Sequence, residues 1–259
     1  YGHGLLDFSG AVEKLGIDWL GVDSVIEGIK LRKEGIKKPI LVLGYTLLEN
    51  FKQAEEYDIS LTISSPEQLK DLPDDLALKI HLKIDTGMHR QGFLLERFDE
   101  AINFLRPKTK DRKSKIDVEG VYTHLANAKN PSFFADTRKQ LGEFNFVIKK
   151  MKEAGFKPIC HAAATGGALI FPEAHYDMVR IGIGLYGLWP SEETEAVYKE
   201  RISLKPILSW KTIVSEVKEL REGGRVGYDF TESVSDGTRL AICPIGYWHG
   251  YPRALSSVG

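Results

Sequence analysis

The sequence predicts an α/β protein: a (β/α)8 barrel of the TIM type that lacks its first strand, followed by a partial β-rich domain. Two observations carry this prediction. Between residues 7 and 187, short apolar β-type runs alternate with helical stretches, which is the pattern of a parallel sheet. Beyond Leu204 the β-type runs follow one another without long helices. Seven β/α steps and one leading helix would complete eight repeats with a strand upstream of Tyr1.

The elements of the barrel follow from local patterns. Strands are expected where short apolar runs are bounded by turn residues, at 18–22, 39–45, 59–63, 78–84, 118–123, 158–163 and 178–183. Helices are expected at 7–15, 24–35, 48–57, from 65 onward, 94–105, 133–155 and 166–171. Gly35 and Gly155 are typical helix stops, and Ser65-Pro66 places a capping residue before a proline.

The domain boundary is expected near residue 190. Residues 1–190 would form the barrel, 191–200 are charged and read as a connector, and 200–259 would form the incomplete β-rich domain with strands at 208–217, 225–228 and 239–244. The alternative for the first domain is an open doubly wound sheet. It is disfavoured because no glycine-rich phosphate loop follows an early strand.

Composition excludes several functional classes. The net charge of -1 over 259 residues gives no electrostatic case for nucleic acid or an anionic membrane as partner. No apolar stretch is long enough to span a bilayer. Cys160 and Cys243 form neither a disulfide framework nor a metal-ligand cluster, and they fit a reducing, cytoplasmic compartment. Because the chain begins at Tyr1 and stops at Gly259 without a closing element, we expect a fragment truncated at both ends.

Polar residues gather at the expected carboxyl ends of four consecutive strands, the edge at which barrels of this kind place their sites. These ends are 83–90, 123–127, 161–167 and 180–183. Taken singly, Lys83 could be a surface lysine, His124 and His161 core histidines, and Thr165 a helix cap. Their coincidence on one rim favours a functional site instead.

Arg180 is the most informative of these residues. It interrupts an apolar run, and a charge in a buried strand needs fixed partners. Gly182 and Gly184 follow it and would let backbone N–H groups approach a ligand closely. An arginine beside bare backbone amides suggests an anion or a polar heterocycle.

Four segments together resemble alanine racemase. They are Lys-Ile-Asp-Thr-Gly-Met-His-Arg at 83–90, Thr-His-Leu-Ala-Asn-Ala at 123–128, Met-Val-Arg-Ile-Gly-Ile at 178–183 and Pro-Ile-Gly-Tyr at 244–247. The resemblance covers nearly the whole chain. It implies a fold-type III pyridoxal 5'-phosphate enzyme, in which a (β/α)8 barrel precedes a β domain.

The resemblance implies cofactor contacts for five residues. Arg180 matches the arginine that donates to the pyridine nitrogen. Its pKa above ~12 means that it should not protonate that nitrogen, which limits delocalisation of a carbanion into the ring. Thr165 would bind the phosphate through its hydroxyl, Gly182 and Ile183 through backbone N–H groups, and Tyr1 through its phenol.

The resemblance also implies catalytic roles. Tyr247 matches the tyrosine that reaches the partner subunit's site and removes the α-proton of the L-isomer, although a phenol with pKa near ~10 needs help to act as a base. His124 would link Tyr247 to Arg180. Arg90 would hold the cofactor's phenolic oxygen and the substrate carboxylate. Lys83 matches a lysine that is carbamylated in many members and would fix Arg90 by a charge-assisted hydrogen bond.

The sequence departs from the family pattern in several places. The family lysine that carries the cofactor as an aldimine lies four residues before the tyrosine matched by Tyr1, so no residue here takes that role. Ala164 stands where asparagine is usual, and Trp248-His249 replaces Ala-Asp after the tyrosine. The last part of the β domain is not included.

The leading hypothesis is a homodimeric enzyme that interconverts L- and D-alanine by a two-base mechanism and supplies D-alanine for peptidoglycan. Alternatives are a racemase of serine or another small amino acid, and a non-catalytic pyridoxal phosphate-binding protein. Single-barrel proteins of the latter kind lack the β domain, so residues 204–253 favour the racemase. A decarboxylase on this barrel would pair the pyridine nitrogen with a carboxylate, and Arg180 argues against it.

Overall fold

The computed structural model describes residues 2–110, 115–130, 132 and 134–256. The chain forms two compact units, Tyr1–Pro206 and Ile207–Gly259. Among the described residues, none of the helices has both the length and the hydrophobicity required to cross a bilayer.

The first unit is a nearly closed barrel of parallel strands. In spatial order its strands are β1 (Leu20–Val22), β2 (Ile40–Val42), β3 (Ser60–Ile63), β4 (Lys79–Asp85), β6 (Asp117–Tyr122), β7 (Ile159–Ala164) and β8 (Met178–Arg180). The short β5 (Phe93–Leu94) pairs with β4. Each neighbour along this row is parallel and next in chain order, as the alternating pattern predicted.

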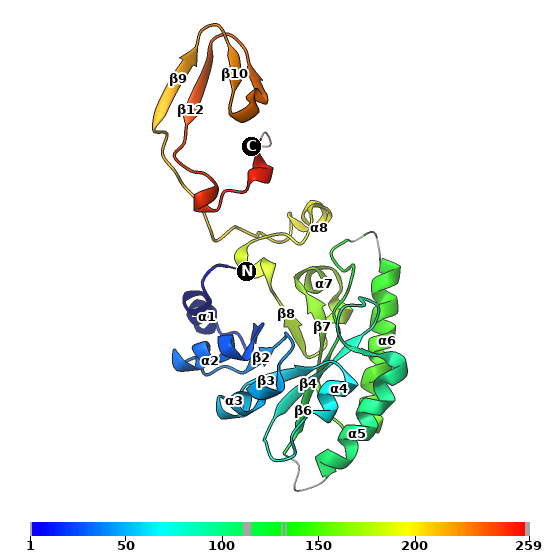
Figure 1. Cartoon of the computed structure of the whole chain (residues 1–259). Coiled ribbons are helices and arrows are strands. Elements are labelled where there is room, and N and C mark those ends of the chain that lie inside the picture. Colours follow the sequence, from blue (N-terminus) through cyan, green and yellow to red (C-terminus); the bar gives the residue numbers. More distant parts are fainter. Residues whose placement is uncertain (1, 111–114, 131, 133, 257–259) are drawn as a thin grey trace. The chain divides into compact units, whose positions relative to one another are not determined.

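Helices lie on the outer side of this sheet, as Figure 1 shows. They are α1 (Leu5–Lys14), α2 (Val25–Lys33), α3 (Phe51–Glu56), α4 (Pro66–Lys70), α5 (Phe98–Lys110), α6 (Phe134–Glu153) and α7 (Thr165–Ile170). The helix α8 (Glu192–Tyr198) follows the last strand of the barrel. Short 3-10 turns are η1 (Leu48–Asn50), η2 (Leu95–Arg97), η3 (Pro172–Ala174) and η4 (Ile183–Tyr186).

The predicted helix signals are confirmed. The Ser65 hydroxyl accepts a hydrogen bond from the Gln68 backbone N–H at 3.3 Å, with Pro66 in the first turn. Gly35 and Gly155 end their helices with φ of 90° and 96°, a conformation that disfavours side chains with a Cβ. Strands β2 and β3 are buried along their whole length because helices cover the face that does not line the barrel.

Two expectations for the end of the barrel are wrong. The strand expected at 178–183 ends at Arg180, because Gly182 turns the chain (φ -108°, ψ -98°) and the next residues form η4. The expected connector at 191–200 contains α8, which begins where the Ser191 hydroxyl accepts from the Thr194 backbone N–H. Because this segment is rich in charged residues, its sequence pattern did not indicate a helix.

The second unit is antiparallel. Its strands are β9 (Glu216–Leu220), β10 (Gly224–Val226), β11 (Glu232–Val234) and β12 (Thr238–Ile242), with 3-10 turns η5 (Tyr228–Phe230), η6 (Tyr247–His249) and η7 (Arg253–Leu255). β9 pairs with β12, and β10 pairs with β11. The run expected at 208–217 is a strand only from Glu216, and β11 was not anticipated. The β-rich character is confirmed.

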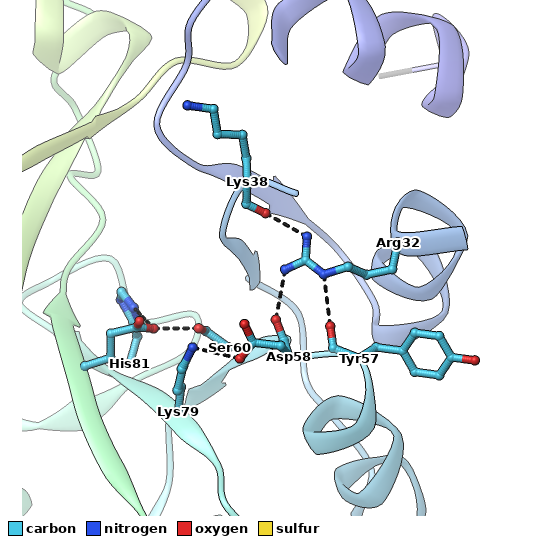
Figure 2. Close-up of polar contacts among 8 residues, drawn as sticks. Arg32, Lys38, Tyr57, Asp58, Ser60, Lys79 and His81 are labelled. Atoms are coloured by element: carbon cyan, nitrogen blue, oxygen red, sulfur yellow. Dashed lines mark hydrogen bonds and ion pairs between the residues drawn. The ribbon is translucent and has the colours of Figure 1, made fainter. Parts of the chain in front are cut away.

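One arginine ties together the ends of the barrel strands opposite their carboxyl termini. Arg32 in α2 donates through Nε to the Tyr57 carbonyl oxygen, through NH1 to those of Ile36 and Lys38, and through NH2 to that of Asp58, at 2.7–2.9 Å. Figure 2 shows the guanidinium among these segments, which lead into β2 and β3. A single cation thus satisfies four loop carbonyl groups.

We predict that Arg32→Leu lowers the free energy of unfolding by about 2 kcal/mol, because a charged donor is lost from several carbonyl oxygens at once. Urea denaturation followed by circular dichroism measures this change. Arg97→Leu is the matched control, since Arg97 pairs with Glu100 at an exposed site and should change stability little. Equal losses in the two variants would contradict the role given to Arg32.

Candidate active site

A cavity of about 840 Å³ opens at the carboxyl ends of β4, β6, β7 and β8. It brings together seven residues singled out from the sequence: Lys83, Arg90, His124, Thr165, Arg180, Gly182 and Ile183. Two further candidates are not among them. Tyr1 lies outside the described residues, and Tyr247 belongs to the second unit.

Arg180 is held in place by acceptors from the neighbouring strand β7 and from the segment after β6. Its NH1 donates to His161 Nδ1 at 2.8 Å. Its NH2 lies 2.8 Å from the Thr123 carbonyl oxygen, 2.9 Å from that of Ala162 and 3.3 Å from His124 Nδ1. The expectation that this charge needs fixed partners is confirmed. Among the described residues its Nε–H has no hydrogen-bond partner, so this donor remains for a ligand.

The surroundings of Arg180 also set its charge. The residue keeps some exposed surface, but its guanidinium is enclosed by protein, and this desolvation lowers the pKa of Arg180 to about 10. It therefore remains a cation at neutral pH.

Tyr122 is a site residue that sequence reasoning missed. Its ring stacks on His161 with centroids 4.6 Å apart, and the Arg180 Cζ lies 5.0 Å from its centroid. The Lys83 Nζ lies 5.6 Å from the same centroid, so one aromatic ring faces two cations. The sequence did contain a signal for Tyr122. It lies two residues after Gly120 on β6, and because side chains alternate along a strand, both residues are on the same face.

Lys83 is buried, with 6% of its surface exposed, so the surface-lysine alternative is wrong. Its Nζ donates to Gln91 Oε1 at 2.9 Å. Desolvation, followed by the charges of Arg90 and Arg180, lowers the pKa of Lys83 to about 8. A substantial neutral fraction of the amine is therefore present near physiological pH.

His124 is neutral in this surrounding. Desolvation first, and then the charges of Arg180, Arg90 and Lys83, lower its pKa to about 4. A guanidinium can only donate, so His124 Nδ1 accepts from Arg180 and the ring proton is on Nε2. The His124 Nε2–H is thereby fixed as a donor.

Gln140 of α6 positions the loop that carries His124, and sequence reasoning missed it too. Its Oε1 accepts from the Ala126 backbone N–H at 2.9 Å, while its Nε2 donates to Thr86 Oγ1 and to the His124 carbonyl oxygen at 3.3 and 3.4 Å. A polar residue on the buried face of a long helix was the signal.

Thr165 lies where backbone amides converge. Its hydroxyl accepts from the N–H groups of Gly182 and Gly184 at 3.2 and 3.3 Å. A Cβ at Gly184 would lie 2.7 Å from Thr165 Cγ2, so a side chain there would force the two segments apart. The glycines beside Arg180 thus allow a close backbone approach to Thr165, and the approach of their N–H groups to a ligand stays a prediction.

Arg90 follows a turn that Asp85 builds. The Asp85 Oδ1 accepts from the backbone N–H groups of Gly87 and His89 at 2.9 and 3.0 Å. Asp85 is therefore a turn residue. Arg90 itself is exposed, lines the cavity and makes no hydrogen bond to the described residues, so its guanidinium is available to an anion.

Comparison with known proteins identifies the family. The family profile "Alanine racemase, N-terminal domain" matches residues 1–190, and "Alanine racemase, C-terminal domain" matches residues 207–259. The chain belongs to the alanine racemase family.

Individual alanine racemases agree in sequence and in fold. The enzyme of Methanococcus maripaludis is 39% identical over 262 residues, covering 98% of this chain and 68% of that protein. The structure from D-cycloserine-producing Streptomyces lavendulae has a TM-score of 0.88 at 29% identity, covering 99% and 67%. That from Bacillus anthracis, with bound L-Ala-P, has a TM-score of 0.81 at 30% identity, covering 98% and 66%. The chain spans about two thirds of the length of these alanine racemases.

Alanine racemases depend on pyridoxal phosphate, and the cavity fits this group. A hydroxyl and converging backbone amides at Thr165 suit a phosphate. The unpartnered Nε–H of Arg180 suits an unprotonated ring nitrogen, and Lys83 and Arg90 add positive charge to the rim. This donor set matches an anionic heterocycle better than an apolar ligand.

We predict that Lys83 in the cofactor-free protein, kept free of carbon dioxide so that the amine is unmodified, titrates near pH 8. Arg90→Gln should move this midpoint upward because a repelling cation is removed. Side-chain NMR of ¹³C-labelled lysine measures it. The folded pKa lies below the ordinary 10.5, so the unfolded state binds more protons between about pH 8 and 10.5, and this residue's contribution makes stability rise with pH across that window.

Lys79 on the same strand is the control for this titration. Its hydrogen bond to Asp58 raises its pKa above the ordinary value, so it should remain charged where Lys83 loses its proton. A Lys83 midpoint in the range of Lys79 would contradict the desolvation argument.

Proposed function

We propose that the protein containing this chain interconverts L-alanine and D-alanine with pyridoxal phosphate by a two-base mechanism. The observation that carries the proposal is the Arg180 guanidinium beside a phosphate-compatible cavity. Its hydrogen bonds to His161 Nδ1 and to the carbonyl oxygens of Thr123 and Ala162 hold it fixed. A guanidinium at this place binds a ring nitrogen without giving it a proton.

The cofactor, when bound, supplies an electron sink for charge that develops at the α-carbon of the amino acid. The Arg180 Nε–H would donate to the ring nitrogen without protonating it, which would restrain that sink and disfavour transamination. Thr165, the backbone N–H groups of Gly182 and Ile183, and the phenol of Tyr1 would hold the phosphate.

Arg90 would bind the substrate carboxylate and the phenolic oxygen of the cofactor. Lys83 is carbamylated in this proposal. Its neutral amine adds to carbon dioxide and loses a proton, and the resulting anion is stabilised by the neighbouring Arg90 and Arg180. The carbamate then accepts from Arg90 and fixes its orientation.

Tyr247 removes the α-proton of the L-isomer within the partner subunit's cavity. The phenol is 63% exposed in its unit, and the Arg253 Cζ lies 5.7 Å from its ring centroid. The His124 Nε2–H is the donor that would meet the phenolate oxygen. Return of the proton on the opposite face requires a second base, and we assign no residue of this chain to it.

A homodimer with shared sites is part of the proposal. No described side chain of residues 207–256 is buried within the unit, and large apolar groups such as Trp210 and Trp248 are exposed on it. Strand pairs without a core need a surface to pack on. Light scattering of the full-length protein measures the oligomeric state. A cytoplasmic location and a role in supplying D-alanine for peptidoglycan complete the proposal, and two free cysteines support the former.

We predict that the full-length protein with pyridoxal phosphate converts L-alanine to D-alanine, and that Tyr247→Phe lowers kcat in the L-to-D direction by at least about 100-fold, the contribution typical of a general base. Chiral chromatography of the products measures both. Tyr228→Phe, an exposed tyrosine of the same unit, should behave as the unaltered protein. A panel including L-serine tests the alternative substrate. Absence of D-alanine from folded, cofactor-loaded protein would refute the proposal.

We further predict that Thr165→Val weakens pyridoxal phosphate binding roughly tenfold, because a hydroxyl hydrogen bond to a charged group is lost at nearly constant volume. Thr165→Ser keeps the hydroxyl and should bind within a few-fold of the unaltered protein. Absorbance titration of the apoprotein measures the dissociation constants. Equal affinity of the valine variant would remove Thr165 from the phosphate site.

A further inference from the structure

A row of hydrogen bonds leads from Arg180 through the barrel interior, away from the cavity. Beyond the Arg180–His161 contact, His161 Nε2 lies 2.9 Å from His81 Nδ1, and His81 Nε2 lies 3.2 Å from Glu119 Oε2. The Ser60 hydroxyl donates to the same carboxylate oxygen at 2.5 Å. We call Arg180, His161, His81 and Glu119 the Arg180–Glu119 relay. Figure 2 shows Ser60 and His81 at its far end.

The two ends of the relay fix the direction of every hydrogen bond in it. Arg180 can only donate, so His161 Nδ1 accepts, and the proton of the neutral His161 ring is on Nε2. That proton is donated to His81 Nδ1, which leaves the His81 proton on Nε2, facing Glu119. A carboxylate only accepts. Both ends therefore demand the same tautomers of the two histidines.

The ionisation of the members agrees with this direction. Both histidine rings are fully buried, and desolvation together with the charge of Arg180 keeps the pKa of His161 well below its ordinary value. Desolvation of Glu119 acts to raise its pKa, but hydrogen bonds from His81 and Ser60 outweigh it, and the carboxyl pKa is lowered. Glu119 is thus an anion at neutral pH.

The backbone of β6 has two features that make room for the relay, a bulge at Glu119 and a glycine at position 120. The register between β4 and β6 shifts between Ile80 and His81, which pair with Val118 and Gly120, so Glu119 is an extra residue on its strand. Such a bulge re-aims a side chain. A Cβ at Gly120 would lie only 2.2 Å from His81 Nδ1, so only glycine leaves room for the His81 ring.

The other polar groups at this end do not enter the row. Lys79, which pairs with Asp58, adds a positive charge near Glu119, and the Trp19 ring meets His81 edge-on at 5.4 Å. Among the described residues, Glu119 is the one acceptor of the His81 Nε2 proton.

We propose that Glu119 is a positioning residue for the cofactor-facing arginine. By accepting the last proton of the relay it keeps the unprotonated Nδ1 of His161 turned toward Arg180. Without an acceptor, the buried His81 Nε2–H has no hydrogen-bond partner. The alternative tautomer of His81 carries its proton on Nδ1, where it would face the His161 Nε2–H, so that two donors would meet. Relief of this clash requires His161 to move or to change its tautomer, which weakens the His161–Arg180 hydrogen bond and leaves the guanidinium less firmly positioned. The consequence for catalysis rests on the proposed function; the tautomers do not.

Two substitutions test the inference. Glu119→Gln keeps the size and one acceptor oxygen, whereas Glu119→Leu removes every acceptor. In full-length protein labelled with ¹⁵N-histidine, ring-nitrogen shifts should place the protons of His161 and His81 on Nε2. The glutamine variant should keep this pattern, and the leucine variant should lose it at His81. The kcat of Glu119→Leu should fall about tenfold, as for other supporting partners of site residues. The KM of Glu119→Leu should stay unchanged because Arg90 is untouched. The kcat of Glu119→Gln should lie within about threefold of that of the unaltered protein.

Lys79→Gln is the matched control at the same end of the barrel. It removes the ion pair with Asp58 but no member of the relay, so ring shifts and kcat should match the unaltered protein. Should Glu119→Leu not fold, Glu119→Met, which also lacks a strong acceptor, replaces it.

Three outcomes would overturn the inference. They are a proton on Nδ1 of either relay histidine in the unaltered protein, unchanged ring shifts in the leucine variant, and a lower unfolding temperature with unchanged kcat. The ring shifts need no turnover. A protein that racemises no amino acid but shows the expected tautomers and their loss in Glu119→Leu would refute the proposed function and uphold the relay.

Discussion

The placement of one enclosed cation, Arg180, constrains the whole site. A guanidinium removed from water requires acceptors in fixed directions. Here the carbonyl groups of Thr123 and Ala162 and the rings of His161 and His124 supply them. These acceptors come from β7 and from the segment after β6, while Arg180 ends β8. The hydrogen bonds therefore couple the ends of three strands, and a donor that faces the cavity is held by the same contacts that hold the barrel together there.

Positive charge is concentrated around this arginine, and the neighbouring groups respond to it. Lys83 and His124 both have lowered pKa values, chiefly through desolvation and then through nearby cations. Tyr122 presents its ring to two of those cations. Such a cluster is unfavourable by itself and becomes favourable when an anion enters. In the alanine racemase family such an anion is the phosphorylated cofactor.

The two ends of the barrel have different roles, one functional and one structural, but they are connected. The carboxyl ends of the strands carry the cavity, and the opposite ends carry fixed structural contacts such as those of Arg32. The Arg180–Glu119 relay joins the two, because His81 and Glu119 lie near the amino ends of β4 and β6 while Arg180 faces the cavity. A substitution at the structural end can therefore alter the orientation of a group at the functional end without touching it.

The sequence by itself determined the barrel, its strand order, the β-rich second unit and most of the cavity's named residues. These features follow from local signals: a period of apolar residues, a capping serine, a glycine stop, and polar groups just after a strand. The family resemblance added roles to residues that local patterns had only marked. Tertiary structure alone decided the early end of β8 and the relay to Glu119, and it revealed the contacts of Tyr122 and Gln140 that their positions in the sequence only marked. The relay joins residues 80 and 38 positions apart through a bulge in strand register. No local period encodes such a contact, because it exists only once the pairing of separate strands has fixed which side chains meet inside the barrel.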